Sequence, residues 1–230
     1  MTREEKIMDS EQLHKHIHST YVSLRVGIGV IAFLLPLLLW GIGSLLKIEL
    51  QTSMSAYYHT RMRDVFVGCL FAIGAFLYLY KGFSVQENQA LNLAGLFAIG
   101  IALLPTHVPI DGTADFTSPR LHTVCAVSFF TLIAYVCWFR AEDTLKKMKN
   151  VKRRAMYRQT YRTLSGLMVL LPCAGAFLIF VLDKGRDYNE SRVVFVIEMA
   201  AIWVFAAFWM IKGREIFITE KVDECVVDCG

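Results

Sequence analysis

The chain has 230 residues, of which 55% are hydrophobic and 19% are charged, and its mean hydropathy is +0.46. A typical soluble domain carries about 25% charged residues. The composition therefore excludes an intrinsically disordered chain, a nucleic-acid-binding module and an ordinary cytosolic enzyme. The length suffices for about six membrane helices of roughly 20 residues each, joined by short connections.

Long apolar runs follow one another along the chain, and charged residues close most of them. The runs cover residues 26–46, 65–80, 90–105, 121–139, 164–182 and 193–211. They are too long for strands and lack an alternation of period two. Backbone groups in lipid must be hydrogen-bonded within their own segment. The sequence therefore predicts an all-α polytopic membrane protein with a six-transmembrane-helix bundle.

The lengths of the first two runs indicate how their helices begin and end. The first run is longer than the apolar core of a signal peptide, so we expect a retained helix. The second run is short, so we expect Arg63 and Asp64 to continue its helix into the membrane interface.

The distribution of Lys and Arg predicts the orientation of the helices. With the N-terminus inside, seven of the 24 basic residues lie outside and the remaining 17 lie inside, nine of them between Arg140 and Arg162. The positive-inside rule then places both termini in the cytoplasm. The predicted organisation is a cytoplasmic N-terminal segment, a transmembrane domain and a cytoplasmic tail, which cover residues 1–25, 26–211 and 212–230. The basic stretch itself is better explained by anionic lipid headgroups than by nucleic acid.

Small residues predict where helices approach closely. Gly68 and Ala72 in the second run, and Ala94, Ala98 and Ala102 in the third, have the small-xxx-small spacing that allows close backbone packing. The two runs also share a five-residue identity. An inverted transporter repeat could produce that identity, but a shared packing solution explains it more simply.

The terminal segments hold two weaker candidates. His14 and His18 could share one helix face as a metal site, although a solvated interfacial segment explains them as well. Cys225 and Cys229 lie in the tail, where reducing conditions disfavour a disulfide. Lipidation of either cysteine remains open.

The outer face gathers the candidate functional residues. His59, His107 and His122 come from three separate places in the sequence, and the topology puts all three at the outer mouth of the bundle. Neutral imidazole is a good ligand for zinc (Zn2+), and catalytic zinc sites use three protein ligands with an open position for water. Asp64 could then orient a ligand or act as a base, and Ser55 could stabilise an oxyanion. This set predicts a catalytic pair, Ser55 and Asp64, beside a histidine metal site.

Alternatives to a metal site remain open. Histidines are common near helix ends, and without a metal the same groups could sense pH. Glu198 lies inside the last apolar run, where an acid is costly and tends to be functional or paired. We expect its partner to be Arg63, Arg120 or one of the outer histidines.

One motif resembles a known but uncharacterised family. Residues 53–60 read Ser-Met-Ser-Ala-Tyr-Tyr-His-Thr and residues 63–68 read Arg-Asp-Val-Phe-Val-Gly. Together with Leu121-His122 and Phe129-Phe130, they resemble a pattern of uncharacterised bacterial multi-pass membrane proteins (a domain of unknown function). The resemblance spans roughly residues 22–210 and implies the membrane fold without an established activity.

A looser similarity is to the CREST superfamily of membrane hydrolases, which includes alkaline ceramidases and adiponectin-type receptors. In those proteins a Ser and a His four residues apart, an Asp and two further His build a zinc site. Ser55 and His59 match the first spacing, and Asp64 could supply the acid. CREST proteins have seven spans and a late HxxxH pair, whereas His107 and His122 lie in mid-chain.

Two functional classes follow from these observations. The first is a zinc-dependent enzyme of a bacterial inner membrane that hydrolyses an amide or ester bond in a lipid-like substrate. The second is a non-catalytic membrane sensor, scaffold or small-solute carrier. The expected partner is the lipid bilayer and not nucleic acid, and the sequence leaves the oligomeric state open.

Overall fold

The computed structural model describes residues 3–104, 119–145, 148, 150–182 and 192–227, and every regular element among them is helical. The elements are α1 (Arg3–Leu45), the 3-10 helix η1 (Ser55–His59), α2 (Arg63–Leu79), α3 (Val85–Leu103), α4 (Pro119–Tyr135), the π-helix η2 (Val136–Arg140), α5 (Ala141–Leu145), α6 (Val151–Leu182) and α7 (Val193–Val227). The all-α prediction is confirmed for these residues.

The long helices form a closed ring of neighbours. In order around the ring, α1 packs on α2, α2 on α3, α3 on α4, α4 on α6, α6 on α7, and α7 returns to α1. Each helix buries one stripe toward the middle. In α2 the stripe is Phe66, Leu70, Ile73 and Leu77, which recur every three or four residues. From α7 the fully buried Phe205 and Trp209 fill the core.

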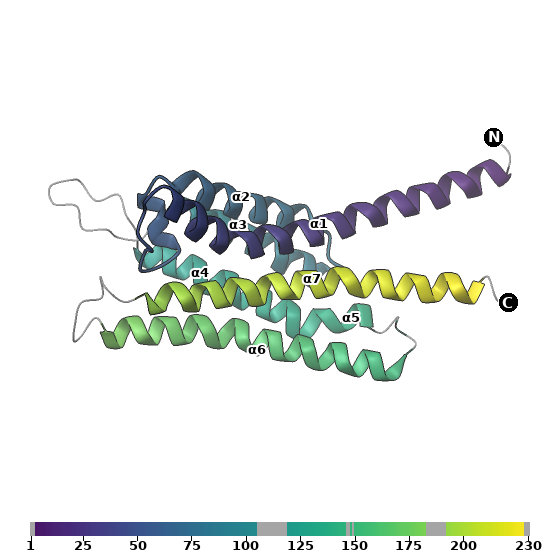
Figure 1. Cartoon of the computed structure of the whole chain (residues 1–230). Coiled ribbons are helices and arrows are strands. Elements are labelled where there is room, and N and C mark those ends of the chain that lie inside the picture. Colours follow the sequence, from purple (N-terminus) through teal and green to yellow (C-terminus); the bar gives the residue numbers. More distant parts are fainter. Residues whose placement is uncertain (1–2, 105–118, 146–147, 149, 183–191, 228–230) are drawn as a thin grey trace.

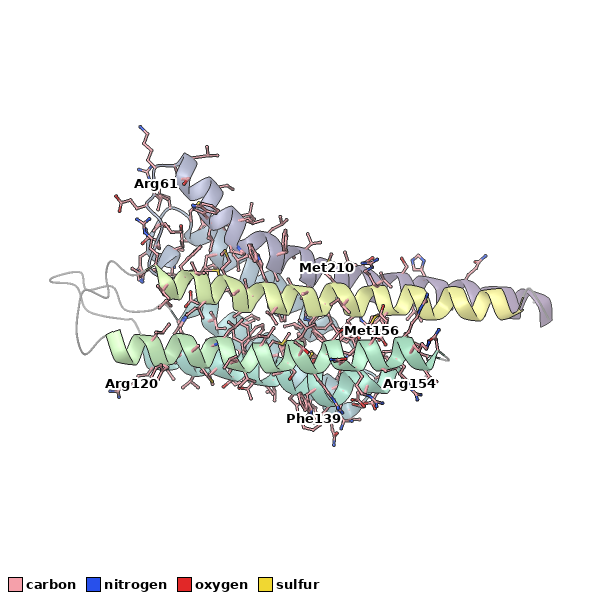
Figure 2. The ribbon with its side chains drawn as sticks, turned by 60° about the horizontal axis from the view of Figure 1, so that its bottom comes forward. Arg61, Arg120, Phe139, Arg154, Met156 and Met210 are labelled. Atoms are coloured by element: carbon pink, nitrogen blue, oxygen red, sulfur yellow. The ribbon has the colours of Figure 1, made fainter. Side chains whose placement is uncertain are left out.

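The bundle has two ends that differ in composition. We call one the η1 end, because η1, Leu104 and Val193 lie there, and the other the α5 end. The N-terminal part of α1 and the C-terminal part of α7 both run beyond the bundle at the α5 end (Figure 1). Figure 2 shows Arg61 and Arg120 at the η1 end and Arg154 at the opposite end.

Three helical stretches are long and apolar enough to cross a membrane by length and composition. They are Ser19–Leu45, Arg120–Leu145 and Val193–Glu215. They correspond to the first, fourth and sixth predicted spans. Many large apolar side chains are also exposed, including Leu45, Phe177 and Leu170 at 83%, 65% and 62%. Because a soluble monomer rarely exposes large contiguous apolar patches, these features indicate a membrane protein.

The other three predicted runs are helical as well. They lie in α2, α3 and α6, whose role as membrane spans stays a prediction. α2 begins at Arg63, as expected from its short apolar run. α6 begins at Val151, well before the predicted apolar run, because helix formation depends on backbone hydrogen bonds and continues through polar residues.

α2 and α3 pack closely on one another, but only some of the predicted small residues lie at the contact. Ala94, Ala98 and Ala102 are buried as expected. Gly68 is exposed, and a Cβ added there would meet nothing within 4 Å. The tight contact is instead between Gly74 and Gly95, where an added Cβ would lie 2.8 or 2.6 Å from the facing carbonyl oxygen. The pattern indicated the two helices, but the register between them is set by tertiary packing.

Candidate functional site

The predicted site residues Ser55, His59 and Asp64 lie at the η1 end but do not face in one direction. Ser55 is buried at 5% exposure, and its hydroxyl lies 3.1 Å from the Ser53 hydroxyl. His59 and Asp64 are both exposed, and the His59 ring packs edge-on against Tyr58. η1 and the first turn of α2 therefore hold the serine inward and the other two outward.

Glu198 has a backbone partner. Its carboxylate accepts a hydrogen bond of 2.6 Å from the Met54 N–H, and the Ser55 backbone is a second partner. A neighbouring bond of 3.0 Å runs from the Phe195 N–H to the Thr52 carbonyl oxygen. Glu198 thus fastens the segment before η1 to the first turns of α7.

Of the charged partners expected for Glu198, which were Arg63, Arg120 and the outer histidines, Arg63 is engaged elsewhere. The Arg63 guanidinium donates a hydrogen bond of 2.7 Å to the Tyr58 hydroxyl and lies 4.4 Å from that ring's centre. A carboxylate buried in an apolar bundle needs hydrogen bonds more than a particular cation, and free backbone N–H groups supply them. The buried carboxylate is therefore satisfied by backbone N–H groups of the segment before α2, which is distant in the sequence.

His122 has a defined orientation. It is 8% exposed, and its Nδ1 lies 2.7 Å from the carbonyl oxygen of Leu104, the C-cap of α3. A carbonyl oxygen can only accept, so Nδ1 carries the proton, and Nε2 keeps a lone pair if the ring is neutral. His122 therefore has a defined tautomer when its ring is neutral.

The predicted zinc site lacks a complete donor set among the residues described. His107 lies outside them, as do the tail residue Cys229 and the side chains of His14, His18 and Cys225. Within the described ranges, no three His, Cys, Asp or Glu side chains come together in a way that could hold a metal ion. His59 and His122 alone do not fit a three-ligand zinc centre, so the metal site stays a prediction that depends on His107.

The densest set of buried charges lies at the α5 end. We call it the buried ionic cluster, and it comprises Arg25 of α1, Glu87 of α3, and Lys212 and Glu215 of α7. These four are 0%, 2%, 2% and 1% exposed. Two tyrosines, Tyr80 and Tyr161, and Thr144 of α5 complete it. Burying four charges costs free energy unless each is paired and hydrogen-bonded.

Arg25 joins α1 to the end of α2 and to α7. Its Nε donates to the Tyr80 hydroxyl at 3.0 Å, Nη2 donates to the same oxygen, and Nη1 donates to the Lys212 carbonyl oxygen at 3.0 Å. The guanidinium carbon also lies 5.1 Å from the Tyr80 ring centre. One side chain therefore ties three helices together through its donors.

Lys212 joins α7 to the segment that follows the π-helix. Its ammonium group donates to the Ala141 carbonyl oxygen at 3.1 Å and to the Thr144 hydroxyl. It also forms an ion pair with Glu215 at 3.2 Å. π-Helical turns are often found at functional sites, and η2 here directly precedes the Ala141 acceptor.

Tyr161 of α6 completes the pairing of Glu215. Its hydroxyl donates to Glu215 Oε2 at 2.5 Å. Burial, and then the adjacent carboxylate, raise the pKa of Tyr161 well above its ordinary value. The phenol therefore stays protonated and remains a donor to Glu215 at every physiological pH.

Glu87 is positioned by the start of α3. The Ser84 hydroxyl accepts from the Glu87 N–H at 3.1 Å, and Glu87 Oε2 accepts from the Phe83 N–H at 2.9 Å. This is a variant of the capping box, in which the glutamate reaches one residue further back than usual. Burial raises the pKa of Glu87, and the positive charges of Lys212 and Arg25 partly oppose that rise.

Sequence reasoning did not predict this cluster, although two local signals point to it. The Ser84-x-x-Glu87 spacing before an apolar run is a capping-box signature. Lys212 and Glu215 are three apart at the end of an apolar helix, a spacing at which side chains meet. Arg25 was counted only as one of the basic residues that set the orientation. No local pattern links it to Glu87 or to Lys212.

Comparisons with known proteins identified no relative of this chain. No family model, no curated protein and no solved structure matches the chain. The resemblances carried by residues 53–68, 121–122 and 129–130 therefore stay predictions.

Proposed function

We propose that this protein is a non-catalytic membrane sensor in which the protonation of Glu87 controls how α1 and α7 leave the bundle. The observation that carries the proposal is the burial of four charges where those two long helices separate from the ring. Replacing a buried ion pair by apolar residues is often neutral or stabilising. A contribution to stability therefore does not explain such a cluster. We infer that its function depends on a change in the charge of one of its members.

The proposed mechanism follows from the charges around Glu87. Arg25 on α1 and Lys212 on α7 both attract the Glu87 carboxylate, and they repel one another. Burial nevertheless raises the pKa of Glu87, so deprotonation inside the packed cluster costs free energy that is recovered when the carboxylate reaches water. Glu215, Tyr161 and Thr144 still hold Lys212, while Asp143 of α5 adds a negative charge nearby. We expect α1 and α7 to move apart as pH rises through the raised pKa of Glu87.

The proposal is tested by measuring the separation of the two helices. Spin-labelled non-natural side chains at Ser19 and Arg214, both exposed, report on α1 and α7 without touching the native cysteines. Pulsed electron spin resonance on protein in nanodiscs should give a longer distance at pH 8 than at pH 5. The variant Glu87→Gln, which keeps this position neutral, should give the shorter distance at both values. Glu142→Gln, on a partly exposed acid of α5, is the matched control and should behave as wild type.

A distance that is the same at both pH values in the wild-type protein would overturn the sensor. So would an equal response of Glu87→Gln and Glu142→Gln, because the change would then not depend on the cluster.

A lipid amidase or esterase is a second proposal, and the fixed tautomer of His122 favours it. A histidine whose Nδ1 is anchored on a carbonyl presents Nε2 as a base or as a ligand. The test combines metal analysis of the purified full chain with His107→Ala and His122→Ala. The enzyme proposal requires stoichiometric zinc that both variants lose. Zinc that is absent, or that both variants retain, would eliminate it.

A further inference from the structure

A basic surface lies beside the buried ionic cluster but faces outward. Nine of the 24 Lys and Arg residues fall between Arg140 and Arg162, and only two acids, Glu142 and Asp143, fall in the same stretch. Both acids are engaged locally. Glu142 lies 3.2 Å from both Arg158 and Arg162, and Asp143 lies 3.4 Å from Arg140. The segment therefore keeps a large positive excess that its own acids do not neutralise.

The cations of this surface alternate with exposed apolar side chains. On the first turns of α6, Lys152 and Arg153 are exposed, and so are Val151 and Met156 at 68% and 57%. A surface that binds the phosphates of nucleic acid uses mainly basic and polar donors. Basic and apolar side chains exposed together on a helix are instead typical of segments that lie at a lipid interface.

Aromatic residues of η2 locate the surface at the depth of lipid headgroups. Trp138 and Phe139 are 41% and 57% exposed, and Figure 2 shows Phe139 pointing away from the bundle. The Arg162 guanidinium lies 5.6 Å from the Trp138 ring centre. These residues lie near the end of the apolar stretch Arg120–Leu145. Tryptophan is enriched where hydrocarbon meets headgroups.

We propose that the start of α6, together with η2 and α5, forms a docking surface for the headgroups of anionic phospholipids. The charge excess supplies the attraction, the aromatic and aliphatic side chains enter the acyl boundary, and the guanidinium groups match phosphate oxygens. Lipid binding here does not depend on the sensor proposal, because the exposed cations are not members of the buried ionic cluster.

The experiment compares two triple variants of the full chain. Lys152→Gln, Arg153→Gln and Arg154→Gln together remove charge from the proposed surface. Arg61→Gln, Arg120→Gln and Arg192→Gln together remove the same charge from exposed positions at the η1 end. Each protein is placed in nanodiscs of phosphatidylcholine with a minor fraction of phosphatidylglycerol, and the lipids retained after detergent extraction are counted by native mass spectrometry.

We expect the wild-type protein and the η1-end variant to retain phosphatidylglycerol in preference to phosphatidylcholine. The α6 variant should lose that preference by about tenfold or more, since each basic residue near the surface contributes about fivefold. Equal retention by the two triple variants would overturn the proposal. So would preferential binding of a short DNA duplex over phosphatidylglycerol vesicles. If the α6 triple variant fails to fold by circular dichroism, Arg153→Gln alone should reduce the preference several-fold, and an unchanged preference would refute the surface.

Discussion

The two ends of the bundle satisfy their polar groups in different ways. At the η1 end, Glu198 and His122 are each bonded to a nearby main-chain group, while His59 is exposed. At the α5 end, side chains from α1, α6 and α7 bond to one another or to distant carbonyls across the bundle, and Glu87 of α3 adds a charge beside them. Backbone partners hold a local segment in place. Side-chain partners from several helices make the arrangement of those helices depend on charge.

The first test of this difference between the two ends removes the cation of the buried ion pair. Lys212→Met leaves Glu215 buried without its partner at 3.2 Å, and we expect the free energy of unfolding to fall by about 3–5 kcal/mol. Adding Glu215→Leu removes both charges and should recover part of the loss. Unfolding by sodium dodecyl sulfate in mixed micelles, followed by tryptophan fluorescence, gives the values.

The control for this variant is Arg158→Met. Arg158 pairs with Glu142 at the surface, with side chains 45% and 27% exposed, so its loss should cost no more than about 1 kcal/mol. If Lys212→Met lowers the free energy of unfolding no more than Arg158→Met does, the buried pair of Lys212 and Glu215 contributes no more than a surface ion pair.

The second prediction concerns the η1 end. Glu198→Ala removes the acceptor of the Met54 N–H, and we expect a loss of about 1.5–3 kcal/mol, the range for hydrogen bonds to charged groups. Hydrogen exchange at the Met54 amide should accelerate, while exchange in α3 should not change. Glu49→Ala, at an exposed position of the preceding segment, is the control. Unchanged protection of Met54 would show that Glu198 does not hold this segment.

The third prediction is a dependence of stability on pH. Burial raises the pKa of Glu87 above its ordinary value, so the folded protein retains a proton that the unfolded chain releases. The stability that Glu87 contributes is therefore complete below about pH 4.3 and is lost as pH rises through its raised pKa. Over this range the unfolding free energy of Glu87→Gln should fall less steeply than that of wild type. Equal slopes for the two proteins would contradict the assignment.

The smallest effect is expected at His59. The side chain is exposed, so His59→Ala should change the unfolding free energy by no more than about 0.5 kcal/mol. A loss as large as that of Glu198→Ala in the same unfolding assay would show that His59 has a structural role at the η1 end.

The helices were largely predictable, but the candidate site was not. Runs of apolar residues indicated every long helix, because helix formation and burial are encoded locally. Because histidine is a common metal ligand, the sequence favoured His59, His107 and His122 as the functional site. The buried ionic cluster combines Arg25, Glu87 and Lys212, whose separation in the sequence carries no signal of contact.

The amino-acid sequence by itself determined the all-helical architecture, the apolar stretches and the concentration of basic residues between Arg140 and Arg162. These properties depend on composition and on periods of a few residues. Only the tertiary structure decided that Gly74 faces Gly95, that Glu198 bonds to Met54 and that Arg25 meets Lys212. The physical reason is that a polar group in an apolar bundle must find a partner. Which partner is within reach depends on the packing of helices distant in the sequence.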